Sequence, residues 1–277
     1  MTEKYDLHCH STASDGTLPP GEVVLRAHRH GVTVLALTDH DTLEGLEEAR
    51  KAADALGLRL INGIEISALY QHQCLHILGL NVDPQNAILL EGIQQQQNIR
   101  LERAQKIADK LEKKQISGAF AAVSAVAGNG EITRNHFADF LLENGYVSTQ
   151  QEAFDRYLGK GQSAYVPTVW TGLEEVVNWI TLAGGVAVVA HPFRYNLSYK
   201  WLNRMLPVFK AAGGQGIEVV NGRSSEDEIR LSRRCAENHQ LYASIGSDFH
   251  HPEHQWIELG RLADFPEGLP AVWELFD

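Results

Sequence analysis

Seven short apolar segments alternate with segments of helical periodicity, and this alternation constrains the fold more than any other feature of the sequence. Such alternation is typical of α/β proteins with a mostly parallel sheet, because each helix carries the chain back across the sheet. We therefore predict a mostly parallel sheet of seven strands, closed into a barrel. The strand-like segments are YDLHCH (5–10), VTVLALTDH (32–40), LRLINGIEIS (58–67), CLHILGLNV (74–82), GGVAVVAHP (184–192), GIEVVNG (216–222) and LYASIGSDFH (241–250).

The stretch between the fourth and fifth strands, about residues 84–183, is too long for one crossover. It begins with a long helical pattern, in which a break is expected near Gly92. Three shorter helical segments that end at glycines follow. We expect residues 100–165 to form a small helical insertion. Residues 1–99 and 166–277 are then expected to form the barrel. The glutamine run at 94–97 predicts a solvated helix face, and a Thr171-x-x-Glu174 pattern predicts a capping box.

Composition limits the partners of the chain. The net charge of −11 argues against a large nucleic-acid surface or an anionic membrane as partner. No apolar run approaches the roughly 20 residues of a membrane helix, and the first residues lack a signal core. Cys9, Cys74 and Cys235 are scattered, which predicts reduced thiols and a cytoplasmic location, with Cys9 and Cys74 buried in strands. An acidic chain can still bind a phosphate, because bound divalent cations can make one pocket positive.

Titratable side chains gather where the predicted strands end. Side chains two apart on a strand share a face, so His8 and His10 are predicted to converge on one point. In parallel α/β barrels, the carboxyl ends of the strands hold the active site. Six strands deliver such residues, mostly at these ends: His8 and His10, Asp39, His40 and Asp41, Glu65, His76, His191, and Asp248 with His250.

Each of these residues alone has a structural explanation, such as a hydrogen-bonded histidine or Asp41 as a helix cap. The set favours metal binding, because six histidines and several carboxylates gathered on one rim are costly to bury unless they are paired or bound to metal. This count exceeds the needs of one ion, so two or three ions are expected, with Glu65 as the bridging carboxylate. Mixed histidine and carboxylate ligands suit Mn²⁺, Zn²⁺ or Fe²⁺.

These segments resemble the successive motifs of the PHP (polymerase and histidinol phosphatase) metallophosphoesterases, in order from DLHCHSTASDG through ALTDHDTLEG, GIEIS, HILGL and AHP to GSDFH. The resemblance implies a distorted (β/α)₇ TIM-like barrel with a trinuclear metal centre. It implies three ligand sets, which are His8, His10, Glu65 and Asp248; Glu65, His76 and His191; and Asp15, His40 and His250. Manganese is the expected metal, with zinc or iron as alternatives.

Within the family, the chain is similar to a stand-alone branch with a helical insertion, whose members act on nucleoside 3′,5′-bisphosphates or trim short RNA from the 5′ end. ITRNHFA, GKGQSAYVP and AHPFRY carry this similarity. It implies that Arg134, Asn135 and His136 bind substrate, with Lys160 and Arg194 as weaker candidates. An arginine suits this role because its fork matches two phosphate oxygens. A solvated surface cation is the alternative interpretation for Arg134 and Lys160.

The expected reaction is hydrolysis of the 3′-phosphate ester by a metal-bridging hydroxide, which leaves a nucleoside 5′-monophosphate. Asp248, His191 or a metal-bound water are the expected proton sources, and the sequence does not choose among them. Three alternatives stay open: a 5′–3′ exoribonuclease on short 5′-phosphorylated RNA, a histidinol-phosphate phosphatase, and a non-catalytic metal-binding module. The sequence leaves the oligomeric state open.

Overall fold

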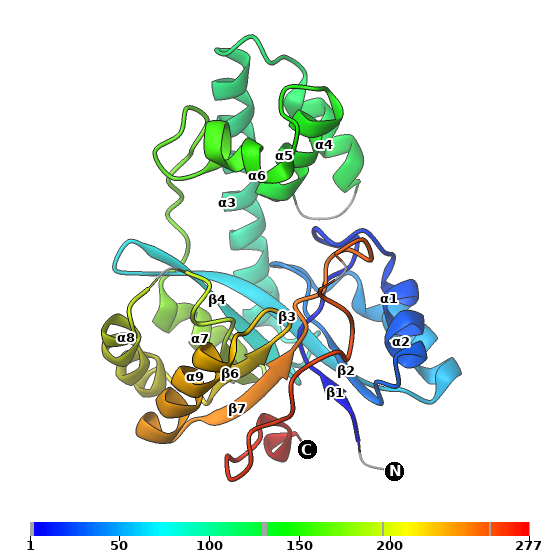
Figure 1. The fold of residues 1–277 in the computed structure, drawn as a ribbon, viewed down its shortest axis with the longest axis vertical. Coiled ribbons are helices and arrows are strands. Elements are labelled where there is room, and N and C mark those ends of the chain that lie inside the picture. The colour runs from blue at the N-terminus through cyan, green and yellow to red at the C-terminus, as the bar shows by residue number, and fades with distance from the viewer. Residues whose placement is uncertain (1–2, 129–131, 196, 255, 277) are drawn as a thin grey trace.

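A single sheet of seven strands, in the order β1 to β7, forms the centre of the computed structural model, which describes residues 3–128, 132–195, 197–254 and 256–276 (Figure 1). Its neighbouring strands follow each other in sequence order, so the predicted α/β barrel is confirmed. The strands are β1 (Tyr5–Asp6), β2 (Val34–Leu37), β3 (Arg59–Tyr70), β4 (Gln73–Leu80), β5 (Val186–Val189), β6 (Gly216–Asn221) and β7 (Tyr242–Gly246).

The sheet curves until its two edges meet. The amide of Leu7 donates to the carbonyl of Ile245, and the amide of Asp248 donates to the carbonyl of His8. Cys9 and Phe249 form a further parallel bridge. These contacts join the chain after β1 to the chain at and after β7, so the loops at the carboxyl ends of the first and last strands lie side by side.

The fourth strand runs against its neighbours, since β4 is antiparallel to both β3 and β5. A two-residue turn joins β3 to β4, and both of its residues, Gln71 and His72, have positive φ angles of 46° and 67°. Positive φ at both positions suits the tight turns whose twist matches a hairpin. The reversal brings the first half of β4, with His76, to the rim formed by the carboxyl ends of the parallel strands.

Helices cover the outside of the barrel and close its core. Phe209 and Trp179 pack with Ile64 and Ile77 of the sheet in the largest apolar cluster, and a second cluster packs two other helices against β2. The helices around the barrel are α1 (Pro20–Arg29), α2 (Leu46–Leu56), α7 (Leu173–Leu182), α8 (Tyr199–Ala211) and α9 (Glu226–His239), with a 3₁₀ turn η2 (Val272–Leu275) near the carboxyl end.

The insertion stands on one end of the barrel and has its own apolar core (Figure 1). One long helix, α3 (Ala87–Glu112), rises from the barrel into it without a break at Gly92. A Cβ on Gly92 would overlap the ring of Trp179, so this glycine allows α3 to lie directly on α7. The other elements are α4 (Ala119–Ala127), α5 (Arg134–Glu143), α6 (Gln150–Ala153) and the π-helical turn η1 (Phe154–Leu158). Because α3 spans both parts, the limits of 100 and 165 stay predictions.

Three local predictions were wrong. Gly172, not Thr171, is the N-cap of α7, and the Thr171 hydroxyl instead contacts Gln95 and Gln96 of α3. The glutamine run is not uniformly solvated, because the fully buried Gln96 donates to the carbonyl of Ser67. Cys74 is exposed, while Cys9 is buried as expected. Each error came from a neighbouring element that local sequence patterns do not report.

Within the described part of the chain, we find no helix with the length and apolar character needed to cross a membrane.

Candidate metal centre

The loops at one end of the barrel bring all nine predicted ligands together. His8 and His10 follow β1, His191 follows β5, and Asp248 with His250 follows β7. Glu65 and His76 come from the β3–β4 hairpin, on the same face of the sheet. Four overlapping groups have ligand atoms that all lie within 4.8 Å of one another: His10, Asp15, His40 and His250; His8, Glu65 and His191; His8, His10 and Asp248; and His40, Glu65 and His76.

Glu65 lies at the centre of these groups and is fully buried. Its Oε1 is 3.0 Å from His76 Nδ1 and 3.0 Å from His191 Nε2. Its Oε2 is 3.2 Å from the Nε2 atoms of His8 and His10 and 3.2 Å from His40 Nδ1. Each carboxylate oxygen therefore faces a different set of imidazoles, which is the arrangement that a bridging carboxylate requires.

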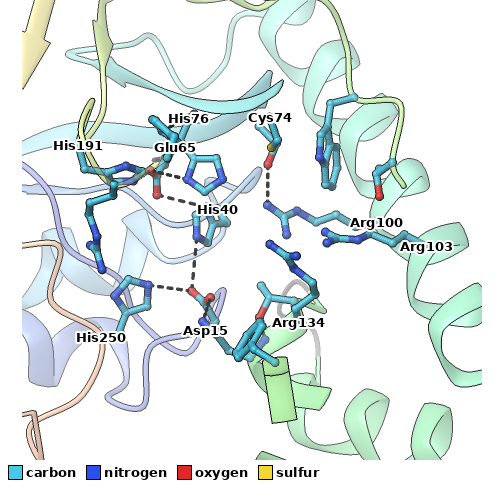
Figure 2. A pocket seen from close by; sticks show the side chains of 18 of the residues that line it. Asp15, His40, Glu65, Cys74, His76, Arg100, Arg103, Arg134, His191 and His250 are labelled. Atoms are coloured by element: carbon cyan, nitrogen blue, oxygen red, sulfur yellow. Dashed lines mark hydrogen bonds and ion pairs between the residues drawn. The ribbon is translucent and has the colours of Figure 1, made fainter. Parts of the chain in front are cut away.

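Two aspartates extend the cluster on either side of the histidines. Asp248 Oδ1 lies 3.4 Å from both His8 Nε2 and His10 Nε2. Asp15 Oδ1 lies 3.4 Å from His250 Nε2 and 3.8 Å from His40 Nε2 (Figure 2). The donor atoms of the cluster thus include both carboxylate oxygens and imidazole nitrogens, the mixture that Mn²⁺, Zn²⁺ and Fe²⁺ accept.

Several atoms at the centre that could bind a metal ion are buried without a hydrogen-bond partner among the described residues. They include Glu65 Oε2, Asp15 Oδ1, His40 Nδ1 and His76 Nδ1. These atoms lie close to one another yet lack hydrogen-bond geometry, and buried polar groups are ordinarily hydrogen-bonded. Buried oxygen and nitrogen atoms that converge on one point without bonding to each other are what a cation site requires. The residues therefore fit divalent metal ions.

The electrostatics also favour charged ligands. Burial opposes ionisation of Glu65, but the neighbouring charges of His8, His76 and His40 outweigh it and hold the pKa of the carboxyl well below its usual range. Asp15 behaves in the same way, with His40 and His250 lowering its pKa. Positive charge at this point therefore keeps both carboxylates ionised, as metal ligands must be.

The histidines are oriented from behind by a residue that the sequence prediction missed. Glu218, on β6, is almost fully buried; its Oε1 lies 3.0 Å from His8 Nδ1, and its Oε2 accepts a 2.6 Å hydrogen bond from the amide of His191. Metal-binding histidines commonly use their second nitrogen in this way, which fixes the ring. The signal was present in GIEVVN, where a lone glutamate interrupts an apolar strand.

Two other buried carboxylates support the loops. Asp39 accepts hydrogen bonds from the amide and hydroxyl of Ser11 and from the hydroxyl of Ser14, which fixes the loop that carries Asp15. Asp41 accepts from the amide and hydroxyl of Ser67 and from Arg100. Through these bonds Asp39 and Asp41 support the loops that hold the ligand cluster.

Strained backbone accompanies the site. His191 has φ 27° and Asp248 has φ 56°, and Asp41 beside His40 has φ 50°. Residues other than glycine rarely adopt positive φ, and such strain persists where the surrounding structure imposes it. The strain at these strand ends turns His191 and Asp248 toward the same point.

A wall of arginines faces the metal-ligand residues across a cavity of about 570 Å³ (Figure 2). Arg100 and Arg103 come from α3, and Arg134 begins α5. Arg100 is paired with Asp41 at 2.5 Å. The guanidinium carbons of Arg100 and Arg103 lie 5.3 and 5.5 Å from the Trp170 ring. Burial, together with the charges of Arg134 and Arg100, lowers the pKa of Arg103 to about 9, so Arg103 is still charged at neutral pH.

The predicted substrate residues take different positions. Arg134 lines the cavity, and Asn135 also lines it but donates a 2.8 Å hydrogen bond to Asp15 Oδ2. Arg194 lines the cavity and forms an ion pair with Asp248. His136 accepts from the amide of Thr133 as part of a helix cap, and Lys160 is exposed; neither is among the described residues that line the cavity.

Arg100 and Arg103 were not predicted from the sequence. They lie three residues apart in NIRLERAQ, which has the mixed polar pattern of an ordinary surface helix. Their role depends on the insertion and on the segment with Trp170 closing over α3, so no local signal marks them.

The chain is similar to known proteins along most of its length. A family model described as the PHP domain matches residues 6–162. The chain is 46% identical over 276 residues to a 5′–3′ exoribonuclease of Haemophilus influenzae, covering 100% of both chains. It is 42% identical over 269 residues to a 3′,5′-nucleoside bisphosphate phosphatase of Chromobacterium violaceum, covering 97% of this chain and 94% of that protein. A crystal structure of a metal-dependent phosphoesterase from Bifidobacterium adolescentis superposes with a TM-score of 0.82 at 29% identity, covering 98% and 93% of the two chains.

Proposed function

The chain belongs to the PHP domain family, and from that premise we propose that it removes the 3′-phosphate from nucleoside 3′,5′-bisphosphates. The family and its relatives make it a metal-dependent hydrolase of phosphate esters. The cavity residues beyond the ligand cluster carry the argument for the substrate.

We assign three cation positions to the ligand cluster, with manganese as the metal. His8, His10, Glu65 and Asp248 would hold one ion, and Glu65 with His76 and His191 a second. Asp15, His40 and His250 would hold a third. The contacts of Glu65 support the first two positions, because its Oε2 lies 3.2 Å from His8 and His10 while its Oε1 lies 3.0 Å from His76 and His191. The group of His10, Asp15, His40 and His250 supports the third position. Bound divalent ions supply charge stabilisation of phosphoryl oxygens and a nucleophilic hydroxide near neutral pH.

The observation that carries the substrate proposal is the pair of arginines without a carboxylate partner. None of the ion pairs in the described residues includes Arg103 or Arg134, although both line the cavity that holds Glu65 and Asp15. Cations that are partly buried and repel one another are costly, and an anionic group between them relieves that cost. A substrate with one phosphate at the ligand cluster and another at these arginines satisfies both ends of the cavity, as a nucleoside bisphosphate does.

The residues also divide the chemical tasks. Burial would raise the pKa of Asp248, but Arg194 and His8 outweigh it and hold the pKa well below its usual range. Asp248 is therefore ionised at neutral pH, and we assign it charge stabilisation and ligand binding. His191 lines the cavity, and we propose it as the group that moves a proton toward the leaving 3′-oxygen.

The arginine wall also separates this proposal from a histidinol-phosphate phosphatase. That substrate carries positive charge, and Arg100, Arg103 and Arg134 would repel it. A 5′–3′ exoribonuclease cleaves the same kind of bond, from phosphorus to the 3′-oxygen, in a longer substrate. Similarity to the exoribonuclease of Haemophilus influenzae makes this activity the second candidate function.

Steady-state kinetics of Arg103→Ala and Arg134→Ala test the proposal on two substrates, adenosine 3′,5′-bisphosphate and p-nitrophenyl phosphate. We expect a fall in kcat/KM of roughly 10- to 100-fold on the bisphosphate, the scale of one lost charged hydrogen bond. On p-nitrophenyl phosphate we expect a change within about threefold. Arg156→Ala, which removes an exposed arginine of the same insertion paired with Glu152, is the matched control. Equal losses on both substrates would remove these arginines from phosphate recognition.

A further inference from the structure

The ladder between β4 and β5 opens at its end on the rim, beside two of the proposed metal ligands. The ladder is regular as far as the pair of Ile77 and Val189. At the next pair, the amide of Ala190 donates to the carbonyl of His76 at 3.1 Å. In a hydrogen-bonded antiparallel pair, the two residues exchange two such bonds. Here the amide of His76, which would make the second bond, donates to a side chain instead.

The hydroxyl of Tyr195 takes the place of that second bond. The amide of His76 donates to this hydroxyl at 2.8 Å, and the hydroxyl donates to the carbonyl of Ala190 at 3.3 Å. One oxygen atom thus stands between two strands that would otherwise bond directly. Because a direct bond of this kind spans about 2.9 Å, the inserted hydroxyl holds the amide nitrogen and the carbonyl oxygen further apart than a regular ladder does.

A tight turn directs Tyr195 to this position. The amide of Arg194 donates to the carbonyl of His191 at 3.0 Å, which closes a turn with Pro192 as its second residue. Proline favours that place in a turn, because its ring presets the φ angle. The turn reverses the chain after β5 and returns Tyr195 to the carbonyl of Ala190. The tyrosine ring also packs against the largest apolar cluster of the barrel, which fixes the direction of its hydroxyl.

The tyrosine ring lies beside both histidines that face one oxygen of Glu65. Its centroid is 5.1 Å from that of His191 and 6.2 Å from that of His76. Nitrogen atoms of these two histidines lie 3.0 Å from Glu65 Oε1. The hydroxyl bonds to the backbone of His76 and to that of the residue before His191. It therefore sets the spacing between the two strands at the point where both imidazoles leave them.

We propose that Tyr195 is a positioning residue for the cation position formed by Glu65, His76 and His191. The proposal rests on the proposed function, which assigns one ion to these three residues. Without the hydroxyl, the amide of His76 and the carbonyl of Ala190 lose their shared partner. Closure of the ladder by a direct bond restores the pairing that backbone groups ordinarily have, and it draws His76 toward His191. The inserted hydroxyl thus keeps open the gap in which the ion binds.

Tyr195→Phe tests the proposal, because it removes the hydroxyl and keeps the ring. Metal-free protein is dialysed at the lowest buffered concentration of free manganese that fills the wild type, and the bound ions are counted by mass spectrometry. We expect the variant to bind one ion fewer, and to need about 10- to 100-fold more free manganese to bind it. Raising manganese to that level should restore kcat on p-nitrophenyl phosphate. Tyr199→Phe is the matched control, since this half-buried tyrosine of α8 accepts a bond from Asn238 at 3.0 Å, and it should match the wild type.

Two double variants identify the position that the hydroxyl serves. His76→Ala removes a ligand of the proposed position, and His250→Ala removes a ligand of another. Tyr195→Phe combined with His76→Ala should bind as many ions as His76→Ala alone, because both changes affect the same ion. Tyr195→Phe combined with His250→Ala should bind one ion fewer than His250→Ala alone. A general loss of structure would instead remove ions in both backgrounds.

The outcomes separate this proposal from the one on which it rests. If His76→Ala binds fewer ions than the wild type while Tyr195→Phe matches Tyr199→Phe, the positioning role is refuted and the cation assignment stands. If Tyr195→Phe removes a further ion from His76→Ala, the hydroxyl does not act on the proposed position, and the proposal is overturned. If His76→Ala keeps every ion, the assigned position is absent and both proposals fall. Ion counting uses no substrate, so a failure to hydrolyse the bisphosphate leaves the result for Tyr195 unchanged.

Discussion

The side-chain amide of Asn135 donates a 2.8 Å hydrogen bond to Oδ2 of Asp15, and this contact joins the helical insertion to the ligand cluster of the barrel. Asn135 is the second residue of α5, while Asp15 lies in the loop after β1. The bond leaves Asp15 Oδ1 facing His40 and His250. The position of the insertion is thus coupled to the orientation of one proposed metal ligand.

Asn135→Ala should weaken cation binding at Asp15, His40 and His250, because the carboxylate of Asp15 loses the donor that orients it. Loss of such a contact typically lowers metal affinity or activity by 10- to 100-fold. Manganese titration followed by mass spectrometry of the bound metal should show that one ion per chain needs a free manganese concentration about 10- to 100-fold higher than in the wild type to bind. Asn144→Ala, at the other end of α5, is the matched control because its side chain donates to the backbone carbonyl of Phe140 instead of to a proposed metal ligand. Unchanged metal content in Asn135→Ala would show that the contact is incidental.

Glu218→Gln should reduce activity and metal affinity by about 10- to 100-fold without changing a ligand. The glutamate accepts from the amide of His191 and contacts His8 Nδ1, and a glutamine can present an oxygen to only one of them. Burial lowers the pKa of His8, whereas the charges of Glu65 and Glu218 raise it above its usual range, so the variant should also lower that pKa. An NMR titration of His8 in the metal-free protein distinguishes this charge effect from a general loss of structure.

Manganese should stabilise the folded chain, since the ligand atoms are gathered only in the native state. A manganese concentration of about 100 times the dissociation constant adds roughly 2.7 kcal/mol to the free energy of unfolding. For a chain of this size we expect Tm to rise by roughly 5–10 °C when manganese is added to chelator-treated protein. Scanning calorimetry of the wild type and of Glu65→Gln provides the comparison. A similar rise in Glu65→Gln would argue against Glu65 as the bridging ligand.

The buried carboxyl of Asp6 should make stability depend on pH. Burial raises the pKa of Asp6 from 3.8 to about 6, although the amides of Gly260 and Ser247 oppose the shift. The folded state therefore binds the proton more tightly than the unfolded state, so the contribution of Asp6 is full below pH 4 and is lost as pH rises through 6. The loss amounts to about 3 kcal/mol at 1.36 kcal/mol per pKa unit.

Urea unfolding of the wild type and Asp6→Asn between pH 4 and 7, with chelator present in both series, measures this contribution. The asparagine carries a constant penalty, because its amide group faces the Gly260 amide that Asp6 Oδ2 accepts from. The advantage of the wild type should shrink as pH rises across the window. Stability curves that stay parallel would place the pKa of Asp6 near its ordinary value.

Gly92→Ala should destabilise the fold by about 1–3 kcal/mol, the usual cost of added volume at a packed contact. The new methyl group would overlap the Trp179 ring and push α3 away from α7. Because α3 also carries Arg100 and Arg103, kcat/KM on a bisphosphate should fall more than on p-nitrophenyl phosphate. Gly172→Ala, at a glycine with an ordinary φ of −62° and nothing within 4 Å of its Cβ position, controls for the loss of glycine. A variant as stable as the wild type would contradict the direct contact between α3 and α7.

The sequence determined the barrel and the candidate ligands. Val, Ile and Leu runs mark the strands because buried parallel strands are apolar on both faces, and a polar residue at the end of such a run, like His191 or Asp248, is therefore visible without a structure. The insertion was visible as well, since glycines end its helices. These features are local, and local patterns are what one chain displays directly.

Only the tertiary structure decided how these pieces meet. The reversed direction of β4, which brings His76 to the rim, depends on backbone angles at Gln71 and His72 that their side chains do not announce. The burial of Arg103 depends on Trp170 and α5 closing over α3. Partner choice between distant residues, such as Glu218 with His8 or Asn135 with Asp15, follows from packing of the whole chain, and no segment contains that information by itself.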